Sequence, residues 1–408
     1  MANNDSEWRA DFPLFQQHPE LAYFDQAATG QYPQSVIDAL NAYMTGANAP
    51  LHRGLYKLAY AATEQFEAVR SQVAEFLHAQ AADEIVFTSG TTAALNLVAQ
   101  AFGNLIVDGS SEIIVSIAEH HSNFLPWQHL AETTGAKLLI APVTAAGAID
   151  EDWVLAHIGM HTRIVALAQE TNVTGAQLQQ VRTIADRVHG QGGYLVLDGA
   201  QAVAHIDIDV QALGCDFYAF SGHKIYGPSG IGVLYGRREL LVEMPPVTLG
   251  GGMINEVTTL TASFAPAPLR FEAGSQNALG VIGLGAAIEY LRARRAAITA
   301  YLRDLTGQVR SALAELPAVT LYSSSVAPAT VSFNVDGVHA HDVATFLDEA
   351  DVAVRAGHHC AQPLMHALGV PAVVRATLGA YTTEDDCQRL IAGVREAAAF
   401  FAEARHES

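Results

Sequence analysis

Residues 217–224 read Phe-Tyr-Ala-Phe-Ser-Gly-His-Lys, an apolar run followed within four residues by a lysine. Consecutive apolar residues of this kind are typical of a strand that is buried on both faces. Burial lowers the pKa of an ammonium group and exposes the neutral amine that condenses with an aldehyde. We therefore interpret Lys224 as a Schiff-base lysine at the end of a buried strand.

A second buried strand ends in a carboxylate. Residues 194–197 read Tyr-Leu-Val-Leu, and Asp198 follows them directly. A carboxylate at this place can hold a pyridinium nitrogen in its protonated form, while a nearby lysine carries the aldehyde carbon of the same cofactor. Asp198 and Lys224 together predict a site for pyridoxal 5'-phosphate (PLP).

The order of apolar runs predicts an α/β fold with a mainly parallel sheet of seven strands. Short runs alternate with amphipathic stretches such as 92–102 and 178–189, which is typical of a sheet covered by helices on both faces. The expected strands are 84–88, 113–117, 137–142, 164–168, 194–197, 217–220 and 232–235. Ligands of such folds bind at the carboxyl ends of the strands, where Asp198 and Lys224 are placed.

The composition changes at Gly250-Gly251-Gly252 and again at residues 265–268, Ala-Pro-Ala-Pro, which are loop signals. Beyond them we expect helix over 280–316 and strands near 329–335, 352–355 and 373–378. These features predict a large domain over 19–268. A smaller α+β domain is expected from 1–18 and 269–408, with the N-terminal segment packed against it.

Composition excludes several classes of protein. The 408 residues are 50% hydrophobic and 16% charged, as expected of a chain with a large core. A net charge of −20 argues against binding of nucleic acid. No apolar run is long enough to span a membrane, the N-terminus has no signal-peptide pattern, and the three cysteines form no close pair. We expect a cytoplasmic protein with free thiols.

Two further strand ends carry polar groups. Ser89-Gly90-Thr91-Thr92 follows one expected strand and opens a helix, an arrangement that suits a phosphate. An ordinary helix cap is the alternative interpretation. His120 follows another strand and is placed to stack on a pyridine ring and move protons, although a purely structural histidine would read the same way.

A third group of residues surrounds a cysteine. Residues 355–361 read Arg-Ala-Gly-His-His-Cys-Ala, so two histidines and Arg355 stand beside Cys360, a setting that favours the thiolate. The alternatives are a buried inert cysteine and a metal site. Adjacent side chains point to opposite sides and no spaced second ligand pair follows, so we predict no metal. Arg375 follows another apolar run and can clamp a carboxylate, or form a surface ion pair.

Taken together, these motifs resemble those of group II cysteine desulfurases of the SufS/CsdA type, in the class V aminotransferase family of PLP fold type I. The resemblance is nearly full-length. It runs through 9–13, 51–54, 118–121, 198–203, 220–228 and 271–274 to the loop 355–361, whose Arg-x-Gly-His-His-Cys pattern is the most specific element.

The resemblance implies a role for each site residue. Lys224, Cys360 and His120 would be catalytic, and Cys360 would take sulfur from L-cysteine as a persulfide and release L-alanine. Residues implied in cofactor binding are Lys224, Asp198, Gln201, His120, Thr91, Thr92, Ser221, His223 and Ser275, the last from a partner subunit. Residues implied in substrate binding are Arg375, Asn172, His52 and Arg355. A homodimer and a SufE-like sulfur acceptor protein are implied as well, while the pathway that uses the sulfur stays open.

The chain departs from the family pattern at a few positions. Ser89 and Ala93 replace a usual Arg and Glu, Ser275-Gln276 replaces Thr-Pro, and Gln26 replaces a serine. Three other functions remain open at this point: a selenocysteine lyase, a class V transaminase or epimerase, and a PLP fold that serves only as a scaffold. The thiol of Cys360 argues against the second, and the retained site residues argue against the third.

Overall fold

The computed structural model describes residues 6–406 and confirms the α/β class with a seven-stranded, mainly parallel sheet. Its strand order is β2-β8-β7-β6-β5-β3-β4. The bounds are β2 (Ile85–Thr88), β3 (Glu112–Ser116), β4 (Lys137–Ala141), β5 (Thr162–Ala168), β6 (Tyr194–Asp198), β7 (Phe217–Ser221) and β8 (Gly232–Gly236). Only β8 runs antiparallel to its two neighbours. Within residues 6–406, no helix is long and apolar enough to cross a membrane.

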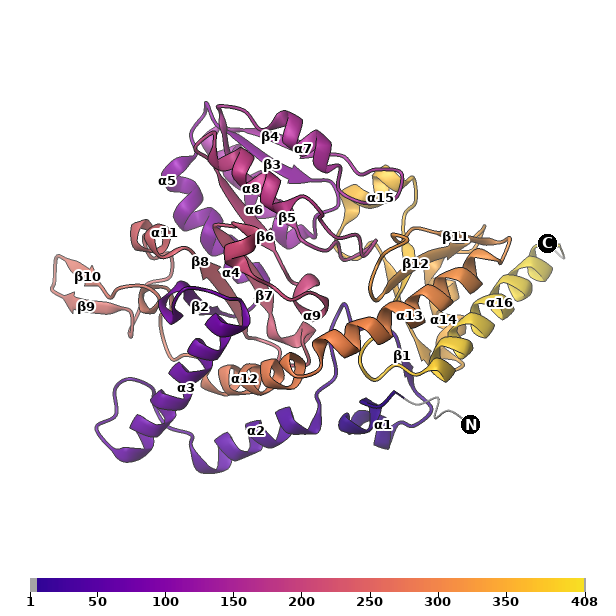
Figure 1. The fold of residues 1–408 in the computed structure, drawn as a ribbon, viewed down its shortest axis with the longest axis horizontal. Coiled ribbons are helices and arrows are strands. Elements are labelled where there is room, and N and C mark those ends of the chain that lie inside the picture. Colours follow the sequence, from indigo (N-terminus) through magenta and orange to yellow (C-terminus); the bar gives the residue numbers. More distant parts are fainter. Residues whose placement is uncertain (1–5, 407–408) are drawn as a thin grey trace.

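Both faces of this sheet are buried, because successive strand residues enter different cores. Leu195 and Leu197 of β6 pack in one core cluster, while Val196 between them packs in the other. Helices cover the two faces (Figure 1). They are α3 (Lys57–Phe76), α4 (Thr91–Leu97), α5 (Asn104–Ile106), α6 (His121–Thr134), α7 (Glu151–His157), α8 (Val181–His189), α9 (Ala202–His205), α10 (Val210–Leu213) and α11 (Arg238–Glu243).

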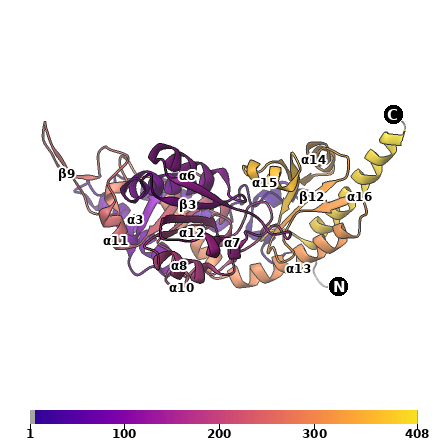
Figure 2. The same cartoon turned by 90° about the horizontal axis from the view of Figure 1, so that it is seen from above.

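A second sheet of four strands lies in the C-terminal part of the chain, in the order β11-β12-β15-β14. Its bounds are β11 (Val319–Leu321), β12 (Thr330–Val335), β14 (Arg355–Gly357) and β15 (Val373–Thr377). The helices of this part are α13 (Arg295–Ala314), α14 (Ala340–Asp348), α15 (Gln362–Leu368) and α16 (Glu384–His406). Figure 2 shows this part beside the larger one, with α13 running along both.

Contacts between the two predicted domains are extensive. β1 (Ala22–Tyr23) pairs in parallel with β13 (Val352–Ala353). α12 (Ala278–Arg292) packs on α2 (Gln34–Gly46) and on α3. The division at residues 18 and 268 therefore stays a prediction.

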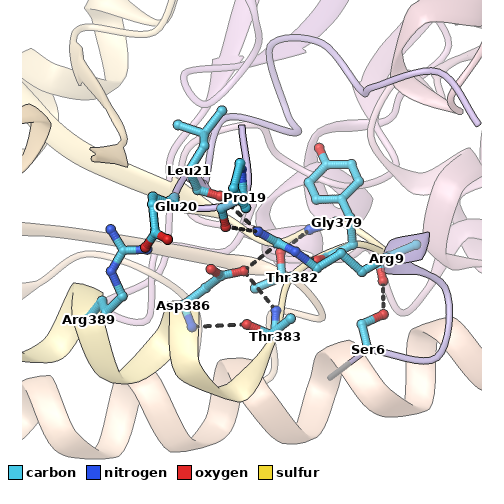
Figure 3. A network of polar contacts seen from close by, with 12 residues as sticks. Ser6, Arg9, Pro19, Glu20, Leu21, Gly379, Thr382, Thr383, Asp386 and Arg389 are labelled. Atoms are coloured by element: carbon cyan, nitrogen blue, oxygen red, sulfur yellow. Dashed lines mark hydrogen bonds and ion pairs between the residues drawn. The ribbon is translucent and has the colours of Figure 1, made fainter. Parts of the chain in front are cut away.

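Residues 6–21 near the N-terminus are joined to α16 and the turn before it by hydrogen bonds (Figure 3). This segment includes α1 (Leu14–Gln17), and Arg9 Nη1 just before this helix donates to Asp386 Oδ2 and to the Tyr381 carbonyl, both at 2.9 Å. Arg389 donates to the carbonyls of Glu20 and Ala350. These contacts join residues 9–21 to the C-terminal part. The assignment of 1–18 to the smaller domain stays a prediction, and residues 1–5 lie outside the described residues.

The helical stretches expected over 280–316 are α12 and α13. Two other elements differ from the sequence-based expectation. Residues 92–102 form α4 followed by a π-helical segment, η3 (Val98–Gly103). The strands β9 (Ile254–Val257) and β10 (Ala262–Phe264) form a hairpin that projects from the body (Figure 2). β9 is exposed along its whole length, so no buried face marks it in the sequence.

Candidate active site

Twelve of the fourteen predicted site residues line one cavity of about 270 Å³ at the carboxyl ends of the central strands. They are Thr91, Thr92, His120, Asn172, Asp198, Gln201, Ser221, His223, Lys224, Arg355, Cys360 and Arg375. His52 and Ser275 lie elsewhere in the chain and line a different cleft, together with Arg53 and Gly274. The sheet explains the gathering, since β6 and β7 are parallel neighbours and Asp198 pairs with Ala219.

Asp198 and Lys224 form the floor of this cavity. Desolvation lowers the pKa of the Lys224 ammonium to about 8, against the opposing charge of Asp198. Desolvation also raises the pKa of Asp198, which the Lys224 charge and the backbone N–H of Ala200 counteract. The N–H of Ala200 donates to Asp198 Oδ1 at 2.9 Å and fixes the carboxylate. A lysine tuned in this way holds an appreciable neutral fraction near pH 7.

Hydroxyl groups and a backbone amide converge at the start of α4. Ser221 Oγ accepts from the N–H of Thr91 at 2.8 Å and lies 2.7 Å from Thr91 Oγ1. Gly90 has a φ of 151°, a conformation that favours glycine, and a Cβ on Gly232 would stand 2.5 Å from the Gly90 Cα. The close approach of these two backbones places the hydroxyls at the cavity wall, where they suit a phosphate.

His120 is a neutral histidine in this cavity. Burial, followed by the charge of Lys224, lowers its pKa to about 3. Its Nδ1 accepts the N–H of Ser122 at 3.1 Å, which leaves the proton on Nε2. Glu119 precedes it and is fully buried, with a pKa that burial raises to about 8. His120 is thus neutral near pH 7 and presents the N–H at Nε2 as a hydrogen-bond donor.

The Cys360 loop, residues 358–361, has an unusual backbone. His359 and Cys360 have φ values of 51° and 55°, so two successive non-glycine residues are left-handed. Hydrogen bonds from other elements hold this shape: Asn172 Nδ2 donates to the His359 carbonyl at 2.7 Å, and the N–H of His121 donates to the Cys360 carbonyl at 2.7 Å. The half-buried thiol of Cys360 lines the cavity as a result.

Arg375 is fully buried and faces two partners. Its Nη1 donates to the Asn172 carbonyl at 2.9 Å and its Nη2 to Asp25 Oδ1 at 3.2 Å. Arg375 Nε and Asn172 Oδ1 are buried without a hydrogen-bond partner among the described residues. Arg355 pairs with Arg375 across β14 and β15 and also lines the cavity. Two guanidinium groups with unused donors suit a carboxylate ligand.

Sequence reasoning missed several residues of this site. Glu170 lines the cavity, and Asp25 contacts Arg375. Gln26 Nε2 donates to the Lys224 carbonyl at 3.0 Å, and Gln26 Oε1 accepts from the Tyr381 hydroxyl at 2.5 Å. The replacement of serine by Gln26 was the one available signal, and the length of the glutamine side chain now accounts for it.

The cavity fits PLP by its donor set. It offers a desolvated lysine, a buried carboxylate at a neighbouring strand end, a neutral histidine and a cluster of hydroxyls. Among residues 6–406, no group of three or more histidine, cysteine, aspartate or glutamate side chains is arranged to hold a metal ion.

Comparisons with known proteins agree with this geometry. The profile of the family described as Aminotransferase class-V matches residues 22–390. A cysteine desulfurase of Yersinia pestis (strain Pestoides F) is 45% identical over 392 residues, which cover 95% of this chain and 96% of the relative. The crystal structure of the cysteine desulfurase CsdA from Escherichia coli is similar with a TM-score of 0.90 and 39% identity, over 98% of this chain and 99% of that chain.

The apo structure of a cysteine desulfurase from Thermococcus onnurineus NA1 is equally similar, with a TM-score of 0.90. It is 36% identical and covers 96% of this chain and 97% of that chain. The agreement extends over both the seven-stranded sheet and the C-terminal part that carries Cys360. The chain belongs to the class V aminotransferase family, in the group of cysteine desulfurases of the SufS/CsdA type.

Proposed function

We propose that this protein is a PLP-dependent cysteine desulfurase that converts L-cysteine to L-alanine and keeps the sulfur as a persulfide on Cys360. The observation that carries the proposal is the position of the thiol. Cys360 lines the same cavity as Lys224 and Asp198, although it comes from the other sheet of the molecule. A transaminase or an epimerase has no use for a thiol at this place.

Lys224 would carry the cofactor, Asp198 would hold its ring nitrogen, and His120 would stack on the ring. The hydroxyls of Thr91, Thr92 and Ser221 would hold its phosphate together with His223, and Gln201 would contact its ring hydroxyl. When bound, PLP supplies an electrophilic aldehyde carbon and an electron-withdrawing ring. The remaining chemistry belongs to side chains of this chain.

Arg375 would bind the carboxylate of L-cysteine, with its unpartnered Nε as a further donor. Binding in this way replaces the contact between Arg375 and Asp25, whose side chain is 24% exposed and can turn toward water. The position of Arg355 opposite Arg375 supports a second contact. These two guanidinium groups would orient the substrate with its thiol toward the Cys360 loop.

Lys224 would take the Cα proton once its amine is free, since a pKa of about 8 leaves it a base near neutral pH. His120, neutral at this pH, would donate a hydrogen bond from Nε2 to the substrate sulfur, whose own proton stays on the persulfide. The thiolate of Cys360 then attacks that sulfur, so an S–S bond forms as the Cβ–S bond breaks. The carbon fragment takes up a proton and leaves as L-alanine, and no outside oxidant is needed.

The test measures sulfide and alanine released from L-cysteine in the presence of a reductant, for the wild type and for Cys360→Ala. We expect equal amounts of both products from the wild type and a loss of at least about 100-fold in the variant, with the cofactor band retained. Cys215→Ala is the matched control, because that thiol is buried outside the cavity.

Three results would overturn the proposal. Turnover of L-cysteine that survives in Cys360→Ala would exclude Cys360 as the sulfur acceptor. A strong preference for L-selenocysteine, with selenide release that survives in the variant, would identify a selenocysteine lyase instead. A product other than alanine would point to a transaminase or an epimerase.

We further propose that the protein acts as a homodimer. Ser275 and His52 lie outside the cavity of their own chain and line a cleft of about 820 Å³. Large apolar side chains are exposed near this cleft, among them Leu55 (89%), Tyr60 (56%) and Leu249 (67%). An exposed apolar surface of this kind favours a second copy of the chain, which would bring Ser275 to the partner's phosphate.

Mixed dimers test this arrangement. Lys224→Ala and Ser275→Asp would each be inactive alone, and mixing them would restore up to about a quarter of the activity. Half of the chains would be in mixed dimers, and each mixed dimer would hold one site with both native residues. Absence of recovery together with a monomeric mass in light scattering would contradict the homodimer.

The persulfide must then pass to a thiol acceptor, and we propose a small protein of the SufE type as its recipient. The half-buried position of Cys360 supports this step, because a persulfide there lies at the cavity mouth. Sulfur labelled on Cys360 should move to such a protein in a single turnover. Labelled sulfur that leaves only with a small-molecule reductant would contradict it.

A further inference from the structure

A second cavity, of about 700 Å³, is lined by residues from the end of α3, from α9 and from the start of α13. Figure 1 shows where these helices lie in the fold. The second cavity shares no lining residue with the active-site cavity. Its wall holds Arg292, Arg295, Arg303, His78 and His205. We propose that this cavity, the distal cleft, is a binding site for a small phosphorylated compound. The proposal does not depend on the desulfurase activity.

Arg295 is the buried cation of the distal cleft. Its side chain is only 10% exposed, and its Nη1 is buried with no hydrogen-bond partner in the described part of the chain. Among the described residues, its one ion-pair partner is Asp207, whose side chain is 72% exposed. An exposed carboxylate stabilises such a pair weakly, while an unsatisfied buried donor is costly. An anion in the cleft would supply the missing acceptor once the Arg295 side chain turns its Nη1 toward the cleft.

The start of α13 gives an independent reason for an anion. This helix of 20 residues begins at Arg295, and its N-cap residue makes no side-chain cap hydrogen bond. The first N–H groups of a helix have no partner within it, and that end carries positive charge. A cation at the first position is therefore unfavourable by itself. An anion bound there would meet both the free amides and the guanidinium.

The other arginines of this region differ in whether their guanidinium groups already have a partner in the fold or are free to bind a ligand. Arg294 is used, because its Nη1 donates to the Tyr290 carbonyl near the end of α12. Arg292 contacts Glu75 at 3.3 Å, but both side chains are at least 60% exposed and can exchange partners. Arg303 stands two turns after Arg295 on the same face of α13 and forms no ion pair with any described residue.

These groups favour phosphate over a simple carboxylate. Glu75 and Asp207 also line the cleft and pair with Arg292 and Arg295, but both carboxylates are largely exposed and can turn away from a ligand. The three guanidinium groups beside a helix N-terminus then form a site for several negative oxygens, since arginine binds phosphate through two parallel hydrogen bonds.

The whole chain has only 22 lysines and arginines against 42 acidic residues. A cleft with three arginines is therefore unusually basic for this acidic protein. Phe76 and Ile206 add apolar wall, and the volume is that of a small-molecule site.

The distal cleft also contacts the wall of the active-site cavity through Glu170. His205 and Gln177 both line the cleft, and both hold this carboxylate: His205 Nδ1 lies 3.1 Å from Oε1, and Gln177 Nε2 donates to Oε2 at 2.8 Å. Glu170 itself lines the active-site cavity. A ligand that contacts His205 would therefore act on Glu170 across one hydrogen bond.

Calorimetric titration of the full chain, saturated with PLP, with pyrophosphate tests the site. Saturation matters because it fills the other phosphate-binding hydroxyls, and the cofactor absorbance reports any displacement. We expect a dissociation constant of about 10–100 μM, weakened at least about tenfold in Arg303→Gln and in Arg295→Gln. Arg303 is exposed, so its variant remains informative if Arg295→Gln fails to fold.

Arg182→Gln is the matched control, since it removes the same charge from an exposed residue outside the cleft. No heat of binding in the wild type, or equal weakening in Arg182→Gln and Arg303→Gln, would overturn the proposal. The Glu170 contacts further predict a shift of at least about twofold in the KM for L-cysteine when pyrophosphate is bound. An unchanged KM with intact binding would overturn that connection alone.

Discussion

The floor of the active-site cavity (Asp198 and Lys224) and the Cys360 loop line the same cavity, but different kinds of structure hold their side chains there. Asp198 and Lys224 stand at the ends of neighbouring strands, with their backbones fixed by the ladder of a buried sheet. The Cys360 loop has two left-handed residues in succession and is held by Asn172 and by the His121 amide. Such residues each cost roughly 1–2 kcal/mol, so the loop conformation depends on its partners.

This difference matches two chemical tasks. Under the proposed function the floor would hold a cofactor in one position, and regular structure provides that rigidity. The thiol of Cys360 would receive sulfur and pass it on, and would therefore meet two different partners. We expect changes in the floor to remove the chemistry altogether, and changes around the Cys360 loop to reduce its rate while the cofactor stays bound.

The largest effect is expected at Lys224. Lys224→Ala removes the amine that would hold the cofactor and take the Cα proton, so turnover of L-cysteine should fall at least about 1,000-fold. The visible band of bound cofactor should disappear as well, measured after dialysis against PLP. Lys137→Ala, at an exposed lysine, should change neither. A band that persists in Lys224→Ala would remove Lys224 from this role.

A smaller loss is expected at Asn172, which tests the loop. Asn172→Ala removes the donor to the His359 carbonyl, so kcat should fall by about 10–100-fold while the cofactor band and the KM remain. Asn334→Ala loses a comparable bond to the Ala372 carbonyl outside the cavity and serves as the control. A rise in KM with unchanged kcat would show that Asn172 binds the substrate carboxylate, as the family resemblance implies.

The sequence predicted the floor of the cavity better than it predicted the Cys360 loop. Strands that end in a chemical group are readable because apolar runs mark them, and all seven strands of the large sheet were expected within a few residues. The hydrogen bond between Asn172 and the His359 carbonyl joins positions 187 residues apart. No local pattern encodes such a contact, and the left-handed conformation of His359 and Cys360 is carried by residue types that do not favour it.

A pH profile sharpens the description of the floor. With a pKa of about 8, the neutral fraction of Lys224 rises about tenfold per pH unit below 8 and levels off above it. The rate at which protein freed of cofactor rebinds PLP, followed by stopped-flow absorbance from pH 6.5 to 9.5, should show this shape. A rise that continues to pH 9.5 would indicate an ordinary, solvated lysine.

One other group titrates in the same range and needs a control. Burial raises the pKa of Glu119 to about 8, and this residue directly precedes His120. If the ionisation of Lys224 controls the rate of PLP rebinding, the pH dependence of this rate should be unchanged in Glu119→Gln. A profile that becomes flat in Glu119→Gln would assign the pH dependence to the carboxyl group instead.

The smallest effect on activity is expected at Gln26, which joins the floor to the C-terminal part. Its side chain bridges the Lys224 carbonyl, which follows β7, and the Tyr381 hydroxyl, which follows β15. Gln26→Ser cannot span this gap and leaves the buried hydroxyl of Tyr381 without its acceptor. We expect the free energy of unfolding to fall by about 1–3 kcal/mol in a denaturant titration, and kcat to fall about two- to fivefold.

Tyr381→Phe separates the two ends of this bridge. If Gln26 acts through Tyr381, the double variant Gln26→Ser/Tyr381→Phe should be less destabilised than the sum of the single variants, because the unsatisfied hydroxyl is gone. Additive effects would show that the contact with the Lys224 carbonyl is independent of the C-terminal part. The sheet alone would then keep the floor rigid. The floor would not depend on contacts from the C-terminal part, whereas the Cys360 loop depends on contacts from other elements.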